Sequence, residues 1–438
     1  MNTAEKEYDL QQLRQEIDQI DTAMAALFEK RLQAVEAVGV YKQQHGLPLR
    51  DPAREEAVVR RVMAQLRQED VRALYPPFIR QVMALSRSYE AARMRATDTM
   101  PEDKAEETVV TCRVEDGEYP IVLQRGSLHH LHRWMQLDRR VCIVTDDGVP
   151  AAYAEAVAAQ CARPIIVTLP QGEENKTLQT AERLWQQMLD AGITRGDCVV
   201  AVGGGVVGDI AGFAAACYMR GVEYYAVPTT VLAQVDASVG GKTGVDLHGV
   251  KNVIGAFYQP KAVVIDPEVL DTLPRRQWSN GMAEAVKMGV IADPVLFSLF
   301  EDEHPEKHLT EIIHRAICAK RDIVQQDVHD NGQRQILNFG HTLGHALEAA
   351  SMSTLLHGEC VALGMLPFCS KSVAERLVPV LQRVGLPTEL SYNTHAVWQA
   401  VQHDKKIRGD EITVVWAQEI GQAQLCRLSM AQLKSRIG

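Results

Sequence analysis

The sequence of 438 residues lacks the features that mark several classes of protein. Its nine cysteines lie singly, without a Cys-x-x-Cys pair, and their odd number argues against a full disulfide framework. We therefore expect reduced thiols and a cytoplasmic protein. No basic cluster is present and the net charge is −10, so no nucleic-acid partner is expected.

Signals for export or membrane insertion are also missing. The opening Met-Asn-Thr-Ala-Glu-Lys-Glu has neither the basic start nor the apolar core of a signal peptide. The longest weakly charged stretch, residues 198–219, is interrupted by a glycine run and by Asp209, so we do not expect it to span a membrane. What remains is an ordinary globular composition, 46% hydrophobic and 23% charged, in a chain long enough for two or three domains.

The first ninety-odd residues have the pattern of a separate helical unit. Apolar residues recur at helical spacing from Leu10 to Val38, which predicts one long helix that ends near Gly46-Leu47-Pro48. Asp51 then stands at an N-cap position before Pro52, and a third apolar stripe runs over about residues 77–93. A helix this long needs partner helices, often from a second copy of the chain.

Cations interrupt the apolar stripe of the long helix. Arg31 lies between Leu27 and Val35, and Lys42 returns to nearly the same face eleven residues later. Arg14 lies about 100° off that face, where it could serve a neighbouring chain. Either these side chains extend to solvent or form internal ion pairs, or they bind a small dianion.

This region resembles the all-helical chorismate mutases over about residues 8–95. The segments that carry the resemblance are Leu13-Arg-Gln-Glu-Ile-Asp18, Arg31, Val38-Gly-Val-Tyr-Lys42, Arg50-Asp-Pro-Ala-Arg-Glu55 and Ser86. The resemblance implies an intertwined homodimer and a pericyclic rearrangement of chorismate, helped by conformation and electrostatics alone. It places these residues at the chorismate site: Arg14, Arg31, Lys42, Asp51, Arg54, Glu55, Ser86 and Glu90.

Glu90 departs from the pattern of that family. Many members have a glutamine here, whose amide donates to the ether oxygen of the substrate, whereas an ionised carboxylate can only accept. Our hypothesis is that the mutase favours acidic pH, with a protonated Glu90 as donor. The alternative is a non-catalytic unit that dimerises or senses a ligand.

A polar, acidic segment, residues 97–107, reads as a linker to an α/β unit. Short apolar runs at residues 141–145, 164–169, 198–202 and 224–227 predict strands that alternate with helices, as in a parallel sheet covered on both faces. After about residue 275 the pattern becomes helical.

Two glycine-rich motifs follow strands of this unit. Gly203-x-Gly205-x-x-Gly208 stands between a strand and an apolar helix expected over residues 210–219, which fits either a dinucleotide-binding turn or a tight strand–helix connection. The segment Ser238-Val-Gly-Gly-Lys-Thr243 has Asp236 where a P-loop needs glycine, so ATP is not predicted.

Histidines cluster in Asn338-Phe-Gly-His341-Thr-Leu-Gly-His345, and His357 follows shortly after. His341 and His345 share one face of a helix, and the glycines between them allow close approach of other groups. With an upstream carboxylate these side chains could bind a divalent metal; otherwise they are hydrogen-bonded histidines of an ordinary helix.

Residues 108–438 resemble the 3-dehydroquinate synthases. The motifs that carry this resemblance are Gly172-Glu-Glu-Asn-Lys176, Gly203-Gly-Gly-Val-Val-Gly-Asp209, Tyr218-Met-Arg220-Gly, Pro228-Thr-Thr230, Asp236-Ala-Ser-Val-Gly-Gly-Lys242-Thr-Gly, Lys251-Asn252, Gly281-Met-Ala-Glu284-Ala-Val-Lys287, Arg334-Gln-Ile-Leu-Asn338-Phe-Gly-His341-Thr-Leu-Gly-His345 and His357-Gly-Glu. The resemblance implies a zinc-type metal (Zn²⁺ or Co²⁺) on Glu284, His341 and His357, with His345 a nearby active-site residue.

The same resemblance implies an NAD site and a substrate site. The NAD residues are Asp146, Glu173, Lys176, Gly203, Gly204, Gly205, Gly208, Asp209, Thr229, Thr230, Asp236 and Thr272. The substrate and catalytic residues are Arg220, Lys242, Lys251, Asn252, Lys287, Lys320, Arg334, Asn338 and His345, with one contact from Lys405 or Lys406.

The implied reaction turns a seven-carbon heptulosonate phosphate into 3-dehydroquinate by transient oxidation, loss of phosphate, re-reduction and ring closure. A related sugar-phosphate cyclase and a polyol dehydrogenase are the alternatives. The expected architecture is an all-α three-helix domain (1–96), a linker (97–107), an α/β nucleotide-binding subdomain (108–275) and a mainly α-helical metal-binding subdomain (276–438). The expected assembly is a homodimer that acts on chorismate and the heptulosonate phosphate.

Overall fold

The computed structural model describes residues 10–44, 52–66, 68, 72, 75–76, 78–80, 82–83, 86, 107–115, 117–248, 250–330, 332–351, 354–389, 394–402 and 407–437. The chain forms two compact units, Met1–Thr99 and Met100–Gly438. In the described part of the chain, no helix combines the length and the apolar character needed to cross a membrane.

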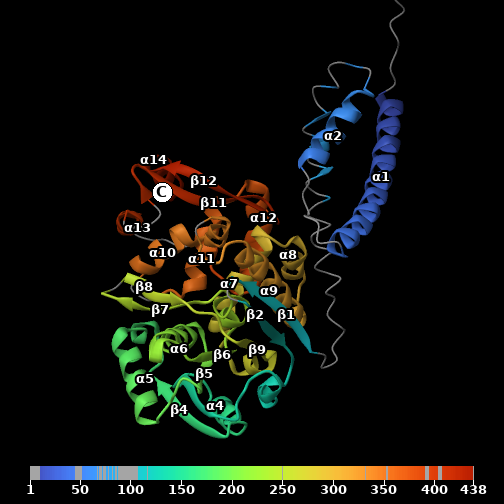
Figure 1. The fold of residues 1–438 in the computed structure, drawn as a ribbon. Helices are drawn as coiled ribbons and strands as arrows, with labels where there is room; N and C mark the ends of the chain where they lie inside the picture. Colours follow the sequence, from blue (N-terminus) through green and yellow to red (C-terminus); the bar gives the residue numbers. More distant parts are fainter. Residues whose placement is uncertain are drawn as a thin grey trace, which may run out of the picture. The chain divides into compact units, whose positions relative to one another are not determined.

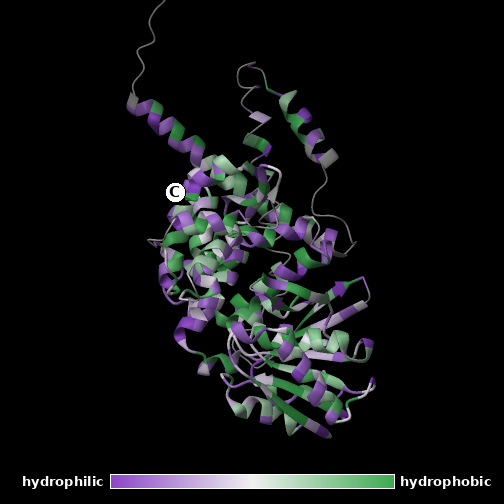
Figure 2. Cartoon of the chain, turned by 90° about the vertical axis from the view of Figure 1, so that its left-hand side faces the viewer, coloured by the Kyte–Doolittle hydropathy of each residue, from purple (hydrophilic) through white to green (hydrophobic). Residues whose placement is uncertain are grey.

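The first unit is helical, as predicted. Helix α1 (Leu10–Gln44) is unbroken for 35 residues, and α2 (Pro52–Met63) follows. Of the third predicted helix, residues 78–80, 82–83 and 86 are described, and they are helical. Met83 and Ser86 are buried, as is Val59 of α2. Figure 2 shows how hydrophilic and hydrophobic residues alternate along α1.

Much of the apolar stripe of α1 is exposed within this one chain. The side chains of Ile17, Ile20 and Leu27 are 56%, 55% and 67% exposed. A row of large apolar side chains in water is unfavourable, and a helix with such a stripe normally buries it against another helix.

The second unit contains a seven-stranded sheet in the order β1-β2-β9-β6-β5-β3-β4. Its strands are β1 (Thr108–Val114), β2 (Gly117–Leu123), β3 (Arg140–Asp146), β4 (Arg163–Leu169), β5 (Cys198–Gly203), β6 (Glu223–Pro228) and β9 (Ala262–Ile265). Within this sheet only β1 and β2 are antiparallel to each other; all other neighbouring strands are parallel. Strand β5 is buried along its whole length. Burial on both faces explains why the central strands are continuous apolar runs in the sequence.

Helices cover this sheet and continue into the second half of the unit (Figure 1). Those of the α/β half are α4 (Ala151–Ala158), α5 (Leu178–Asp190) and α6 (Gly205–Cys217). Helix α6 begins at Gly205 and not at residue 210 as expected, so Gly208 and Asp209 lie in its first turns. A hairpin of β7 (Lys242–Leu247) and β8 (Val250–Phe257) follows.

The second half of the unit is mainly helical, as predicted. Its helices are α7 (Arg275–Ile291), α8 (Pro294–Glu301), α9 (Leu309–Gln326), α10 (His341–Ala350), α11 (His357–Met365), α12 (Lys371–Arg383), α13 (Thr394–Val401) and α14 (Met430–Ile437). Every residue of α7 from Trp278 to Ile291 is buried, so this helix forms the centre of that half.

A three-stranded antiparallel sheet in this half was not predicted from the sequence. It consists of β10 (Ile407–Arg408), β11 (Glu411–Glu419) and β12 (Gln422–Ser429). The β-branched run in β11 and the turn at Gly421, where φ is +81°, are the local signals for this hairpin.

Candidate active site

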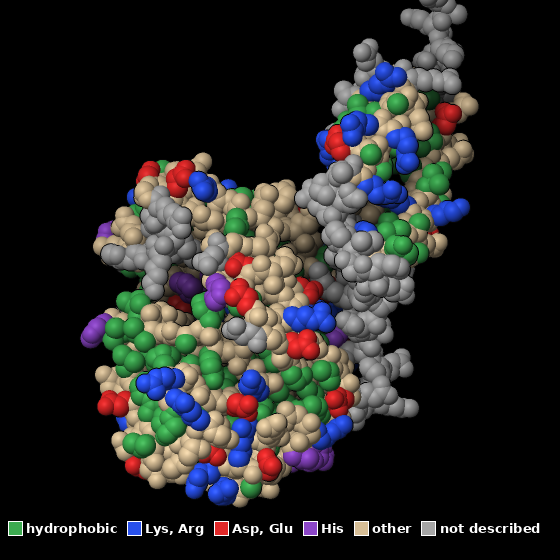
Figure 3. Space-filling view, in the orientation of Figure 1, with side chains coloured by type: hydrophobic (Ala, Val, Ile, Leu, Met, Phe, Trp, Pro, Cys, Tyr) green, Lys and Arg blue, Asp and Glu red, His purple; other side chains and the backbone are tan. Residues whose placement is uncertain are grey.

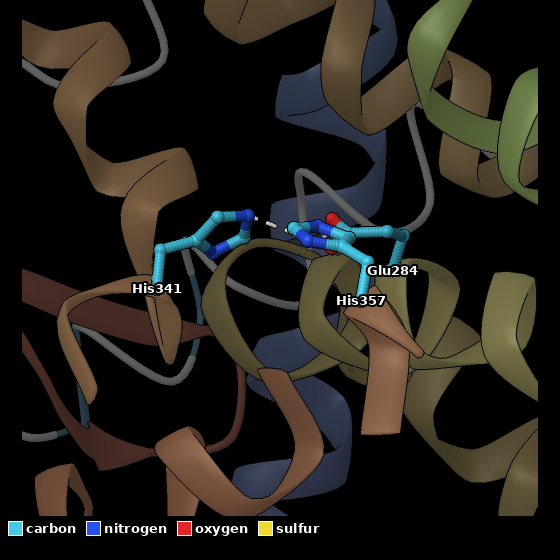
Figure 4. A group of neighbouring side chains, drawn as sticks. All are labelled: Glu284, His341 and His357. Carbon is cyan, nitrogen blue, oxygen red and sulfur yellow. Dashed lines mark ion pairs between the residues drawn. The ribbon is translucent and has the colours of Figure 1, made fainter. Parts of the chain in front are cut away.

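Three side chains from three helices converge in the helical half of the second unit (Figure 4). Glu284 comes from α7, His341 is the first residue of α10, and His357 is the first residue of α11. Glu284 Oε1 lies 3.6 Å from His341 Nε2 and 3.5 Å from His357 Nε2. The structure therefore brings together the carboxylate and the two histidines proposed as metal ligands.

Glycines explain how these helices come so close. A Cβ on Gly358 would lie 2.0 Å from the carbonyl oxygen of Asn280 in α7, and one on Gly364 would lie 2.0 Å from that of Gly340. A Cβ on Gly344 would lie 3.1 Å from the carbonyl oxygen of Cys360. The expectation that glycines in this stretch permit close backbone approach is confirmed.

The cluster is suited to a divalent cation. Glu284 is 1% exposed; its Oε2 forms an ion pair with Lys287, and its Oε1 faces the Nε2 atoms of His341 and His357. A buried carboxylate needs positive charge around it, and here Lys287 supplies part of that charge while Oε1 and the two imidazoles remain directed at one another. One carboxylate and two imidazoles are also a donor set that zinc-type metals accept, with a position left open for another ligand.

Nearby charges act on the ionisation of the cluster. Burial would raise the pKa of Glu284, but Lys287, which forms an ion pair with it, and His341 hold that pKa well below its ordinary value. Burial and the positive charge of Lys287 lower the pKa of His341. Burial would also lower the pKa of His357, yet contacts with Glu284 and Glu348 raise it to about 9.

Both histidines have a hydrogen-bond acceptor behind the ring. His341 Nδ1 lies 3.0 Å from the carbonyl oxygen of Phe339, and His357 Nδ1 lies 3.4 Å from Glu348 Oε2. With its proton on Nδ1, each ring presents Nε2 toward Glu284. The third ring, His345, has its centroid 5.2 Å from that of His341 and 6.0 Å from that of His357. Figure 3 shows histidine side chains in a recess of this face.

The proposed substrate cations are held by carboxylates and carbonyl groups. Lys242 Nζ lies 2.5 Å from Asp330 Oδ2, Lys251 Nζ lies 2.8 Å from Glu348 Oε1, and Lys320 Nζ lies 2.8 Å from Asp236 Oδ1. These charges are therefore positioned before any substrate arrives.

Three further residues predicted to contact the substrate differ in their exposure to solvent. Arg334 is buried and donates to the carbonyl oxygens of Val328 and Gly240, while its Nε has no acceptor among the described residues. Asn338 is half-buried at the end of a short 3₁₀ helix, residues 333–338. Arg220 is exposed, and its φ of +67° follows that of Met219 at +51°.

Two of the predicted nucleotide residues, Asp146 and Gly203, lie at the switch point of the parallel sheet. After β3 the chain moves outward to β4 and then returns to the other side of β3 to form β5, so the connections diverge between β3 and β5. Asp146 ends β3 and Gly203 ends β5. Ligands of doubly wound sheets bind in the crevice at such a point, outside the carboxyl ends of the strands.

A pocket opens at the end of β5. The glycines 203–205, Gly208, Asp209, Lys242 and Tyr258 are among the residues that line it. A Cβ on Gly203 would meet the side chain of Val207 at 2.6 Å, so glycine is required for the packing of α6 on β5. The backbone N–H of Thr229 donates to the carbonyl oxygen of Gly203, and Thr230 Oγ1 accepts from Ala233 N.

Lys176 is buried beside this pocket and joins two other predicted site residues. Its Nζ lies 2.5 Å from Asp209 Oδ2 and 2.5 Å from Asn252 Oδ1. Burial would lower the pKa of Lys176, but the charges of Asp209 and Glu173 raise it, so the ammonium stays charged.

The other predicted cofactor residues have local partners. Asp146 Oδ1 accepts from the N–H groups of Gly148 and Val149, and burial raises the pKa of Asp146. Asp236 lies in a π-helical turn, Ala233–Ala237, a feature frequent at functional sites. Thr272 Oγ1 lies 2.9 Å from the hydroxyl of Tyr153.

In the first unit, the predicted chorismate residues are described in part. Arg14 and Arg54 are exposed, whereas Arg31 and Lys42 are half-buried. Arg31 Nε is buried without an acceptor among the described residues, and Ser86 Oγ donates to the carbonyl oxygen of Val82. The predictions for Asp51, Glu90, Lys405, Lys406 and the side chain of Glu55 lie outside the described residues.

Two carboxylates in contact with the site were not singled out from the sequence. Glu348 contacts His357 and Lys251, and Asp330 contacts Lys242. The signal for Glu348 is its spacing, because residue i+7 from His341 lies on the same face of α10. No comparable pattern marks Asp330.

Three family models match this chain. "Chorismate mutase type II" matches residues 13–91, "3-dehydroquinate synthase N-terminal" matches residues 166–280, and "3-dehydroquinate synthase C-terminal" matches residues 281–407. A 3-dehydroquinate synthase of Streptococcus sanguinis is 42% identical over 339 residues, which cover 72% of this chain and 96% of that protein.

Solved structures match the second unit. A 2-deoxy-scyllo-inosose synthase complexed with carbaglucose-6-phosphate, NAD⁺ and Co²⁺ is 25% identical, with a TM-score of 0.69 over 75% of this chain and 99% of that one. A 2-epi-5-epi-valiolone synthase from Streptomyces hygroscopicus with NAD⁺ and Zn²⁺ bound is 26% identical, with a TM-score of 0.68 over 74% of this chain and 97% of that one.

Proposed function

We propose that this chain, which belongs to the 3-dehydroquinate synthase family and has a chorismate mutase type II domain over residues 13–91, is a bifunctional enzyme. Its second unit would convert 3-deoxy-D-arabino-heptulosonate 7-phosphate to 3-dehydroquinate and phosphate. The observation that carries this proposal is the cluster of Glu284, His341 and His357, with Lys287 paired to Glu284 and Lys251 linked to His357 through Glu348.

We propose NAD and a divalent metal, Zn²⁺ or Co²⁺, as cofactors of this reaction. NAD would be bound at the β3–β5 switch point and the metal by Glu284, His341 and His357. When bound, NAD supplies reversible hydride transfer and the metal supplies polarisation of a substrate oxygen.

The residues of this chain would bind and orient an anion that changes its charge distribution during the reaction. Lys242, Lys251 and Lys320 would exchange their present carboxylate and carbonyl partners for phosphate, carboxylate and hydroxyl oxygens of the substrate. Fixed cations of this kind stabilise developing negative charge without reorganisation. The proposed contacts of Arg220, Asn252, Lys287, Arg334, Asn338, His345 and one of Lys405 and Lys406 follow from the family motifs.

Lys320 gives this activity a predicted upper pH limit. Burial lowers the pKa of Lys320 to about 8, although Asp236 opposes the shift. The ammonium is present below that pKa and is lost as the pH rises through it, so we expect kcat/KM to fall by about tenfold per pH unit above about pH 8. The pH profile of phosphate release measures this fall.

The matched variant for that experiment is Lys320→Arg. A guanidinium keeps its charge throughout this range, so the decline should disappear even if the overall rate is lower. A wild-type profile that stays flat to pH 9.5 would contradict the role of Lys320.

For the first unit we propose the rearrangement of chorismate to prephenate by a homodimer. The half-buried Arg31, whose Nε has no acceptor among the described residues, is suited to a carboxylate or ether oxygen. The exposed stripe with Ile17, Ile20 and Leu27 supports a second copy as the partner that covers it. A unit that only dimerises or senses a ligand is the alternative.

Glu90 predicts an acidic optimum for the mutase. Prephenate formation should rise as the pH falls from about 8 to 5, because only the protonated carboxyl can donate to the ether oxygen. Glu90→Gln donates at every pH, so its profile should be flat and its rate near neutrality higher than that of the wild type. A wild-type profile that is already flat would remove Glu90 from this role.

Two other activities compete for the second unit. The similar solved structures include sugar-phosphate cyclases at 25–26% identity, below the 42% of the 3-dehydroquinate synthase. A polyol dehydrogenase would produce net NADH, whereas the proposed reaction releases one phosphate per substrate with no net NADH. Assays of phosphate release and of NADH absorbance, run in parallel on the heptulosonate phosphate, distinguish the dehydrogenase from the proposed synthase.

A further inference from the structure

Glu348 holds two components of the proposed site at once. It lies on α10, seven residues after His341, and its side chain is 15% exposed. Its two carboxylate oxygens have different partners: Oε2 lies 3.4 Å from His357 Nδ1, and Oε1 lies 2.8 Å from Lys251 Nζ. Neither the family motifs quoted above nor the pattern of the sequence gave this residue a role.

The two histidines of the metal cluster are oriented by different means. The Nδ1 atom of His341 faces the carbonyl oxygen of Phe339, a backbone group two residues away that the start of α10 holds in place. The Nδ1 atom of His357 faces the carboxylate of Glu348, a side chain that belongs to another helix and can rotate. The orientation of His357 therefore depends on whatever holds the Glu348 carboxylate in place.

Lys251 is the group that holds it. This lysine lies on β8, 97 residues earlier in the chain, and its Nζ also lies 3.5 Å from Glu173 Oε1. A continuous series of contacts thus runs from Glu173 through Lys251 and Glu348 to His357. It joins the α/β half of the unit to the metal cluster of the helical half.

We propose that Glu348 is a positioning residue that couples the metal site to the substrate cation Lys251. It orients His357 through one oxygen and Lys251 through the other, so a change at either end alters the geometry at the other end. This inference rests on the proposed function, which makes His357 a metal ligand and Lys251 a substrate contact. Energetic coupling of this kind is reciprocal: metal binding should change substrate affinity by the same factor by which substrate binding changes metal affinity.

The test measures metal binding directly. The metal-free full-length protein is titrated with Zn²⁺ against a chelator of known affinity, and with Co²⁺ while its visible absorption spectrum is recorded. Glu348→Gln keeps the shape of the side chain but loses its charge. We expect it to bind Zn²⁺ about 10- to 100-fold more weakly than the wild type and to show an altered Co²⁺ spectrum.

The coupling is tested with Lys251→Met in two backgrounds. In the wild-type background this substitution should change the Zn²⁺ dissociation constant by at least about threefold. In the Glu348→Gln background it should leave the Zn²⁺ dissociation constant unchanged, because the effect of Lys251 passes through Glu348. Glu301→Gln is the control for loss of a carboxylate, since Glu301 pairs with Arg376 on α12. It should bind Zn²⁺ as the wild type does.

Each failure has a separate meaning. If Glu348→Gln and the wild type share one Zn²⁺ affinity and one Co²⁺ spectrum, Glu348 does not position the ligand. If the effects of Glu348→Gln and Lys251→Met add, the two residues act independently and the coupling is wrong. If the wild type itself takes up no metal, the metal centre of the proposed function fails instead.

Discussion

Glu284→Gln is expected to lose metal binding and to form 3-dehydroquinate at least about 10³-fold more slowly than the wild type. The substitution removes the charged ligand of the cluster, a carboxylate that is 1% exposed and whose Oε1 faces both histidine Nε2 atoms. A loss of about 4 kcal/mol in transition-state stabilisation corresponds to that factor. Zinc content and the rate of phosphate release are the measurements.

A second variant separates chemistry from folding in this experiment. Glu284→Gln leaves Lys287, which is 2% exposed, without its ion-pair partner, so some loss of stability is expected. His357→Gln removes a ligand that is 29% exposed on its side chain and should be milder for folding. If both variants fold, as judged by circular dichroism, and retain wild-type rates, the three residues do not form the metal centre.

Arg31→Ala is expected to lower prephenate formation by about 10²- to 10³-fold while 3-dehydroquinate formation stays as in the wild type. The guanidinium is half-buried and its Nε has no acceptor among the described residues, which is the state of a group that awaits an anion. Removal of one preorganised donor typically costs that factor in rate. Both reactions are assayed on the same preparation, so the synthase serves as internal control.

Lys30→Ala is the matched control for this variant. Lys30 is exposed on α1, next to Arg31 in sequence but about 100° away around the helix. It should leave both activities unchanged. Loss of mutase activity in Lys30→Ala, or its retention in Arg31→Ala, would place the chorismate site elsewhere.

The sequence predicted the parallel sheet well because its strands have a simple physical signature. Strands buried on both faces appear as short apolar runs, and the observed β3, β4, β5 and β6 lie within two residues of the predicted ones. The hairpin of β11 and β12 was missed because β12 is largely exposed or half-buried and lacks such a run.

The site was predictable in part for a related reason. His341 and His345 share a helix, so their spacing alone indicates a common face. Glu284 lies 57 residues before His341, and only its resemblance to a family motif linked the two. Their contact results from close packing of α7, α10 and α11 around Gly344, Gly358 and Gly364, which is a long-range property.

The identity of the product decides whether the second unit makes 3-dehydroquinate, as we propose. The most direct test is to incubate the purified chain with 3-deoxy-D-arabino-heptulosonate 7-phosphate, NAD and Zn²⁺ and to identify the product by nuclear magnetic resonance. We expect 3-dehydroquinate, with one phosphate released per molecule formed. A different carbocycle, or an oxidised open-chain product accompanied by NADH, would contradict it.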